Sequence, residues 1–123
     1  MVIDANVLAA YYLARDPALR VRLVGLEWYA PPIWRSEFMS TLRSWMVRRK
    51  LSLEAAVVAH GEAEVEIIPA PSPDAAHVFA LAEASGCSTY DCEYLAAAQM
   101  MDVPLLTLDA QVLRAFPQVA RTP

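Results

Sequence analysis

The chain alternates short apolar runs with longer segments whose apolar side chains recur at helical spacing. This alternation is typical of an α/β fold. Strands are predicted over four short runs, at residues 1–4, 28–30, 66–68 and 103–108. Helices are predicted over the segments between them, at residues 5–13, 17–25, 33–49, 52–64, 72–86, 88–101 and 110–115.

Proline, glycine and cap residues mark the helix boundaries. Pro17 stands at the start of one helix and Gly25 near its end, the positions that these two residues prefer. Residues 72–74 are expected to supply an N-cap serine, a first-turn proline and a first-turn acid to a later helix, which should end at Gly86. The turn at residues 69–71 is too short to be a domain linker, so the pattern predicts one domain.

Composition agrees with a single domain over residues 1–123, because 57% of the residues are apolar, 20% are charged and the net charge is only −4. A domain of this size buries roughly two-thirds of the surface of its unfolded chain, so it needs no disulfide or structural metal to fold. The longest uncharged stretch, Ala5 to Ala14, is well short of the roughly 20 residues of a membrane-spanning helix. The first residues carry no basic signal region, so we expect a cytoplasmic protein in which Cys87 and Cys92 are reduced.

Several enzyme classes are excluded by what the chain contains. Its three glycines are isolated, so neither a phosphate-binding GxxxxGK[ST] loop nor a GxGxxG turn is present. His60 and His77 lie in apolar helical patterns without the HExxH or nucleophile-elbow context of zinc or serine hydrolases. The single lysine, Lys50, is not at a strand end, which argues against a receiver-type phospho-acceptor domain.

Two acids directly follow predicted strands. Asp4 comes after Val2 and Ile3, and Asp109 comes after the run that ends at Leu108. Ligands bind at the carboxyl ends of the strands in open parallel sheets. Either aspartate could instead cap the helix that follows it. Capping explains each acid alone, but it does not explain two such strand ends together with the next two acids.

Two further acids lie on predicted helices. Glu37 is flanked on the helical wheel by a stripe of small and polar residues beside the apolar face, although it could be an ordinary exposed glutamate. Asp91 lies in the first turn of an unusually apolar, alanine-rich helix, where a capping box with Ser88 is the alternative role. Glu93 could serve in place of Asp91, but it points about 200° away on the wheel, toward expected solvent.

Charge is distributed unevenly along the chain. Residues 51–113 carry a charge of −10 with no lysine or arginine, whereas residues 1–50 carry +4. Carboxylates gathered without bases repel one another and favour a cation, and all-oxygen ligands suit Mg²⁺ or Mn²⁺. The bases cluster near the end of the long predicted helix, where they could stabilise its C-terminus or bind phosphates. These bases are Arg43, Arg48, Arg49 and Lys50.

Four segments of the chain, in order, resemble motifs of the PIN-domain nucleases. They are similar in particular to the small VapC-type toxins of toxin–antitoxin pairs. The most specific is the alanine-rich helix around Asp91. The four segments are Val2 to Asn6, Pro32 to Phe38, Thr89 to Ala98 and Val103 to Asp109.

The resemblance implies a three-layer α/β/α sandwich around a parallel sheet of about five strands. It implies Mg²⁺- or Mn²⁺-dependent cleavage of RNA and a cognate antitoxin partner. By position, the catalytic and metal-binding acids would be Asp4, Glu37, Asp91 and Asp109. Asn6 and Thr89 would be supporting polar groups, and the basic cluster would contact RNA.

The sequence is also compatible with two other functions. One is a catalytically silent binding module with the same fold, against which the four intact acids argue. The other is a nuclease that processes RNA or DNA without an antitoxin. The high apolar content and the three tryptophans also predict a homodimer, in agreement with the resemblance.

Overall fold

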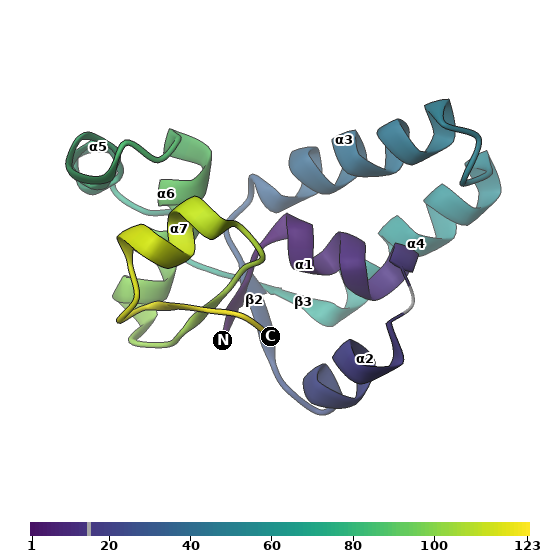
Figure 1. The fold of residues 1–123 in the computed structure, drawn as a ribbon, viewed down its shortest axis with the longest axis horizontal. Helices are drawn as coiled ribbons and strands as arrows, with labels where there is room; N and C mark the ends of the chain where they lie inside the picture. Colours follow the sequence, from purple (N-terminus) through teal and green to yellow (C-terminus); the bar gives the residue numbers. More distant parts are fainter. Residues whose placement is uncertain (15) are drawn as a thin grey trace.

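The computed structural model describes residues 1–14 and 16–123 (Figure 1). Within these ranges, five strands form one parallel sheet in the order β3-β2-β1-β4-β5. The chain builds β2 and β3 on one side of β1, and β4 and β5 on the other, so the strand order reverses between β1 and β4. The strands are β1 (Val2–Ile3), β2 (Trp28–Ala30), β3 (Ile67–Pro69), β4 (Leu105–Leu106) and β5 (Ala120–Arg121).

Seven α-helices flank the sheet in the described part of the chain, which confirms the predicted α/β sandwich. Helices α3 and α4 extend together to one side of the sheet, whereas α5, α6 and α7 gather on the other side (Figure 1). The helices are α1 (Ala5–Ala9), α2 (Pro17–Leu23), α3 (Trp34–Val47), α4 (Leu53–Glu66), α5 (Ala75–Ser85), α6 (Thr89–Met101) and α7 (Ala110–Ala115). None of the helices in residues 1–14 and 16–123 has the length and apolar character to cross a bilayer.

Small side chains on α6 let this helix lie close to the central strands. Residues 96–98 are three alanines with no exposed surface, and α6 packs against β1 and β4. On the opposite side, Phe38 of α3 is fully buried beside α1. The two packed faces hold the ends of β1 and β4 at fixed positions between α3 and α6.

The fourth predicted strand is shorter than the pattern indicated. Strand β4 contains only Leu105 and Leu106. The Thr107 N–H still donates to the Arg121 carbonyl of β5 at 3.0 Å, but the Leu108 N–H donates to the Asn6 side chain, so the chain leaves the sheet there. Strand β5 was not among the four strands predicted from the residues. It has only two residues, one of them exposed, so it is too short to leave a periodic signal.

Two helix starts also differ from prediction. Helix α5 begins at Ala75 with Asp74 at the N-cap position and no side-chain cap bond, so Ser72 is not its cap. The prolines at 71 and 73 disfavour helical backbone in the residues before them, which delays the helix. Its predicted end at Gly86 is confirmed, with φ of 71°.

The helix predicted over residues 5–13 is interrupted. It continues after Ala9 as a π-helical segment, η1 (Ala10–Ala14). Within η1, the buried Tyr12 packs on Phe38 and its hydroxyl donates a 2.6 Å hydrogen bond to Glu66. These contacts come from α3 and α4, so local helical periodicity could not reveal them.

Candidate active site

Asp4 lies at the carboxyl end of β1 and is held by hydrogen bonds on both of its carboxylate oxygens. It caps α1, because Oδ1 accepts the backbone N–H of Asn6 at 3.3 Å. Oδ2 accepts the Thr107 hydroxyl at 2.6 Å and the Asn6 side-chain amide at 2.7 Å. The carboxylate is only 7% exposed. Asp4 therefore does cap α1, the alternative role considered for it. The same carboxylate is also buried, so its charge would be stabilised by a cation.

Thr107 connects the end of β4 to the end of β1. Its side chain has no exposed surface, and besides donating to Asp4 it accepts the Asn6 amide at 3.1 Å and the Asp109 backbone N–H at 3.0 Å. Asn6 adds a second link by accepting the Leu108 backbone N–H at 3.0 Å. These bonds fix Asp4 and Asp109 relative to each other at the point where the strand order reverses.

Asp109 caps α7 with one carboxylate oxygen. Oδ1 accepts the backbone N–H groups of Gln111 and Val112 at 2.7 and 3.0 Å. Oδ2 makes no hydrogen bond to the described residues. One oxygen therefore sets the orientation of the carboxylate, and the other is available to a ligand.

Glu37 lies in the first turn of α3 and is half-buried. Its Oε2 accepts the hydroxyl of the buried Tyr94 at 2.7 Å, a contact that joins α3 to α6. The structure gives Oε1 no partner within the described ranges. Tyr94 thus orients Glu37 in the way that Thr107 orients Asp4.

Asp91 forms the capping box that was considered as its alternative role. Ser88 Oγ accepts the Asp91 N–H at 3.1 Å, and Asp91 Oδ2 accepts the Ser88 hydroxyl at 2.7 Å and the Ser88 N–H at 3.3 Å. Among the described residues, Oδ1 has no hydrogen-bond donor. Thr89, predicted as a supporting group, is exposed at the first position of α6.

The acids repel one another electrostatically. Burial, followed by the charges of Asp91 and Asp109, raises the pKa of Asp4 even though its hydrogen bonds from Thr107 and Asn6 oppose the shift. Burial also raises the pKa of Glu37, with contributions from the charges of Asp4 and Asp91. Asp4 therefore lies within electrostatic reach of Asp91 and Asp109, and Glu37 within reach of Asp4 and Asp91.

The four acids have the oxygen donors that suit Mg²⁺ or Mn²⁺, but their carboxylates are not close enough together to share an ion. Among residues 1–14 and 16–123, no hydrogen-bond donor reaches one oxygen of Glu37, of Asp91 and of Asp109, and Oδ1 of Asp4 has only the long bond from Asn6. Within the described residues, no three acidic, histidine or cysteine side chains are close enough to share a metal ion as they are placed. Metal binding would therefore require the carboxylates to turn their available oxygens toward one another.

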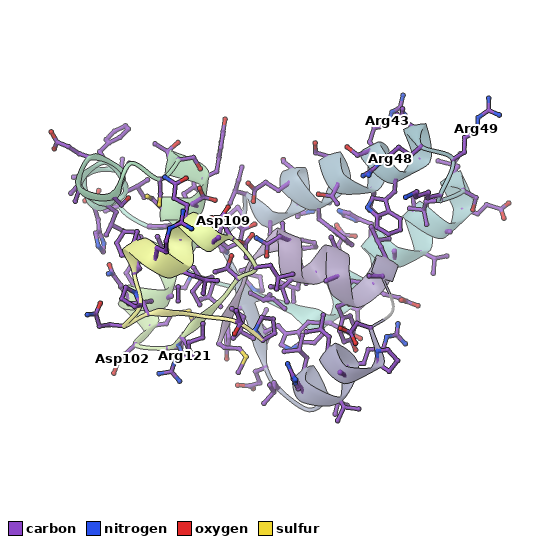
Figure 2. All side chains as sticks on the ribbon, viewed as in Figure 1. Arg43, Arg48, Arg49, Asp102, Asp109 and Arg121 are labelled. Atoms are coloured by element: carbon purple, nitrogen blue, oxygen red, sulfur yellow. The ribbon has the colours of Figure 1, made fainter. Side chains whose placement is uncertain are left out.

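The basic cluster is remote from these acids. Figure 2 shows Arg43, Arg48 and Arg49 at the far end of α3 from the sheet, well away from Asp109. At about 1.5 Å rise per residue, Arg48 is about 16 Å along the helix from Glu37. The bases therefore do not lie beside the acids, where a phosphate at the reaction centre would meet them.

Three residues near the site were missed or misplaced by sequence reasoning. Glu93 was expected to face solvent; it is half-buried, and its charge contributes to the raised pKa of Glu37. Tyr94 was placed on the same helical face as Asp91 but was given no role. Thr107 could have been suspected, because it is a polar residue between a strand and an acid.

The raised pKa values of Asp4 and Glu37 predict the pH dependence of stability. The folded protein holds these protons above about pH 4, where the unfolded chain has released them, so in EDTA the free energy of unfolding should fall as pH rises toward 7. Glu37→Gln keeps an acceptor for Tyr94, so this variant should be more stable than wild type at pH 7. Its free energy of unfolding should also depend less on pH. Urea unfolding across pH tests this, with the exposed Glu83→Gln as control. Equal slopes for wild type and Glu37→Gln would contradict it.

Thr107→Val should destabilise the metal-free protein by about 1–3 kcal/mol. The substitution removes the donor to Asp4 and leaves the partly buried Asp109 N–H without its acceptor. Chemical unfolding measures the loss, and Thr122→Val, at an exposed position, is the matched control. A Thr107→Val protein within about 0.5 kcal/mol of wild type would show that this network contributes little.

Comparison with known proteins places the fold. The PIN domain family profile matches residues 1–120. PAE2754 from Pyrobaculum aerophilum has a similar structure, with a TM-score of 0.76, 20% identity, and coverage of 98% of this chain and 87% of that one. FitAcB from Neisseria gonorrhoeae is also similar, with a TM-score of 0.72, 17% identity, and coverage of 99% of this chain and 96% of that one. No curated protein matches the chain in sequence. From the profile match over nearly its whole length, the chain belongs to the PIN domain family.

Proposed function

We propose that this protein is a Mg²⁺- or Mn²⁺-dependent endoribonuclease. The proposal rests on four carboxylates that are each anchored by hydrogen bonds, two of them at the ends of β1 and β4 where the strand order reverses, together with the charges that raise the pKa of Asp4 and of Glu37. Anchoring groups of this kind orient metal ligands in known metal sites. A solvated surface acid would need neither the burial nor the anchors.

The proposed ligands are Asp4, Glu37, Asp91 and Asp109. When bound, a divalent ion supplies Lewis acidity at a phosphodiester oxygen and lowers the pKa of an attacking water. Either Asp91 or Asp109 would orient that water, since each has an oxygen without a hydrogen bond from the described residues. The absence of a histidine from this set argues against general acid–base catalysis without a metal.

The anchoring residues have separate positioning roles in this proposal. Thr107 and Asn6 hold Asp4 between the two strand ends, and Tyr94 holds Glu37. Thr89, exposed at the start of α6, is proposed as a polar group near the substrate. These contacts reduce the freedom that the carboxylates would lose on binding a cation.

We further propose that the protein is the toxin of a toxin–antitoxin pair and acts on RNA in the cytoplasm. The four motif segments similar to those of VapC-type toxins support this role. A PIN nuclease that processes RNA or DNA without an antitoxin is the alternative. Cleavage assays on RNA and DNA, together with a search for an adjacent gene for a DNA-binding protein, separate the two.

Asp91→Asn should abolish RNA cleavage without unfolding the protein. The amide keeps an acceptor for the Ser88 cap but loses the charge that binds metal and interacts with the helix dipole, so stability should change by no more than about 1 kcal/mol. Cleavage of an RNA panel is measured in Mg²⁺, Mn²⁺ and EDTA, with the exposed Asp102→Asn as control. Figure 2 shows Asp102 on the opposite side of the molecule from the α3 helix end.

The outcomes separate the proposed activity from its rivals. Metal-dependent cleavage by wild type and Asp102→Asn, but not by Asp91→Asn, supports the nuclease. Wild-type protein that binds RNA but cleaves neither RNA nor DNA in any metal would favour the silent binding module. Full activity of Asp91→Asn in Mg²⁺ would remove Asp91 from the ligand set.

A homodimer is also proposed. Several large apolar side chains are exposed in the structure, including Val65 at 87%, Phe79 at 64% and Val57 at 64%. Trp28 and Trp34, however, are buried in the core, so they no longer support the prediction of a dimer. We expect a mass of twice 13.6 kDa by light scattering. A monomer at high concentration would contradict this.

A further inference from the structure

We propose that the corner between α3 and α4 is a docking site for single-stranded RNA, separate from the four acids. The site consists of Trp45, Arg48, Arg49 and Lys50 at the end of α3, with Arg20 of α2 across a hollow of about 640 Å³. That the ligand is RNA rests on the proposed function. Single-stranded nucleic acid is bound by basic grooves that carry aromatic rings on which bases stack, and this corner combines basic side chains with the half-buried ring of Trp45.

The backbone at the end of α3 positions these side chains together. The Lys50 N–H donates to the Trp45 carbonyl and the Arg49 N–H donates to the Met46 carbonyl, both at 2.9 Å, which is the hydrogen-bond pattern of a Schellman motif. As a result, the Lys50 ammonium lies over the Trp45 ring, 6.0 Å from its centroid. A half-buried ring with a cation above it offers one surface for a base and one charge for a phosphate.

Arg49 stands where this motif normally has glycine. Its φ is 54°, in the left-handed region that disfavours a residue with a Cβ. Gly25 and Gly86, elsewhere in the chain, occupy positive-φ positions with φ of 76° and 71°. An arginine here, like Asp102 at φ of 52°, therefore carries a backbone strain that glycine would avoid.

The basic side chains of this corner are free of ion pairs with the described carboxylates. Arg48, Arg49 and Lys50 are exposed, and within residues 1–14 and 16–123 none of them forms an ion pair with a carboxylate. Arg20 and Lys50 both line the hollow, where Glu62 is the carboxylate among the described lining residues. The corner therefore keeps an excess of positive charge for an anionic ligand.

Arg43 is not part of this site, although it belongs to the same cluster in the sequence. It lines a different groove, beside Met39 and Leu42 on the other side of α3. The distance of about 16 Å along α3 from Glu37 to Arg48 means that a strand held at the corner must extend over several nucleotides to reach the acids. The docking site would therefore favour longer single-stranded substrates over very short ones.

The test is binding of a fluorescently labelled 20-nucleotide single-stranded RNA in EDTA, followed by anisotropy over a range of salt. Each phosphate contact on a single strand contributes a slope of about −0.7 in log affinity against log salt, or about fivefold at 0.1 M. Arg49→Gly and Lys50→Gln should each weaken binding by about fivefold and reduce the slope by about 0.7. Arg121→Ala, at an exposed position on β5, should have no such effect (Figure 2).

Arg49→Gly has a second readout that separates binding from structure. Because glycine relieves the left-handed strain, the melting temperature should rise by about 1–4 °C while RNA affinity falls. A structural role for Arg49 would instead lower both. Trp45→Phe, which keeps a stacking ring, should bind RNA more tightly than Trp45→Leu.

Failure of this inference differs from failure of the proposed function. Unchanged RNA affinity in Arg49→Gly and Lys50→Gln, with cleavage intact, overturns the docking site alone. RNA binding that depends on these residues without any cleavage overturns the nuclease and leaves the docking site. If poly-glutamate competes with RNA at equal charge concentration, the corner binds acidic protein and the assignment to RNA is wrong.

Discussion

The arrangement of this site depends on one buried hydrogen bond, in which the Thr107 hydroxyl donates to Asp4 at 2.6 Å. It joins the carboxyl ends of β1 and β4, which are neighbours in the sheet although about a hundred residues separate them in sequence. Buried polar groups require partners, because an unpaired one loses its hydration without compensation. Here the same partners also set the direction of a carboxylate. The same hydrogen bonds therefore stabilise the fold and orient the carboxylate of the candidate site.

The site is costly for the protein without a ligand. Asp4 is buried with no cation beside it among the described residues, and the neighbouring acids raise its pKa further. Glu37 shows the same effect despite the hydroxyl of Tyr94. A divalent cation would convert these repulsions into favourable interactions, so binding would stabilise the fold by mass action. The apolar sheet and the alanine face of α6 supply the stability that this cluster reduces.

Local signals predicted the helices well. Ser88 caps α6, α7 runs from Ala110 to Ala115 as predicted, and Gly86 ends α5, because capping and glycine preferences depend on neighbouring residues. The two-residue β5 and the π-helical turn of η1 were not predictable from the residues. Both depend on pairing or packing with segments distant in the sequence.

The four candidate acids could be predicted from the sequence, whereas most of the residues that hydrogen-bond to them could not. Asp4 and Asp109 could be recognised because charges after apolar runs are conspicuous, and their motifs resemble those of a known family. Tyr94 looks in the sequence like an ordinary helix residue, and although Thr107 is a conspicuous polar residue after an apolar run, its partner Asp4 is distant in the sequence. Their roles depend on the distances that the fold sets between α3, α6 and the two strand ends. The remoteness of Arg48 from Glu37, by contrast, was predictable, because both residues fall in the helix predicted over residues 33–49 and their spacing sets their separation along its axis.

We propose that Asp4, Glu37, Asp91 and Asp109 together bind a divalent cation. Anomalous diffraction from crystals soaked in Mn²⁺ tests this, because the signal locates the metal independently of activity. The expected result is an anomalous peak bounded by oxygens of these four carboxylates, with Thr107 still bonded to Asp4 and Tyr94 to Glu37. A well-ordered structure at saturating Mn²⁺ with no peak there, or with a peak at other side chains only, would contradict it.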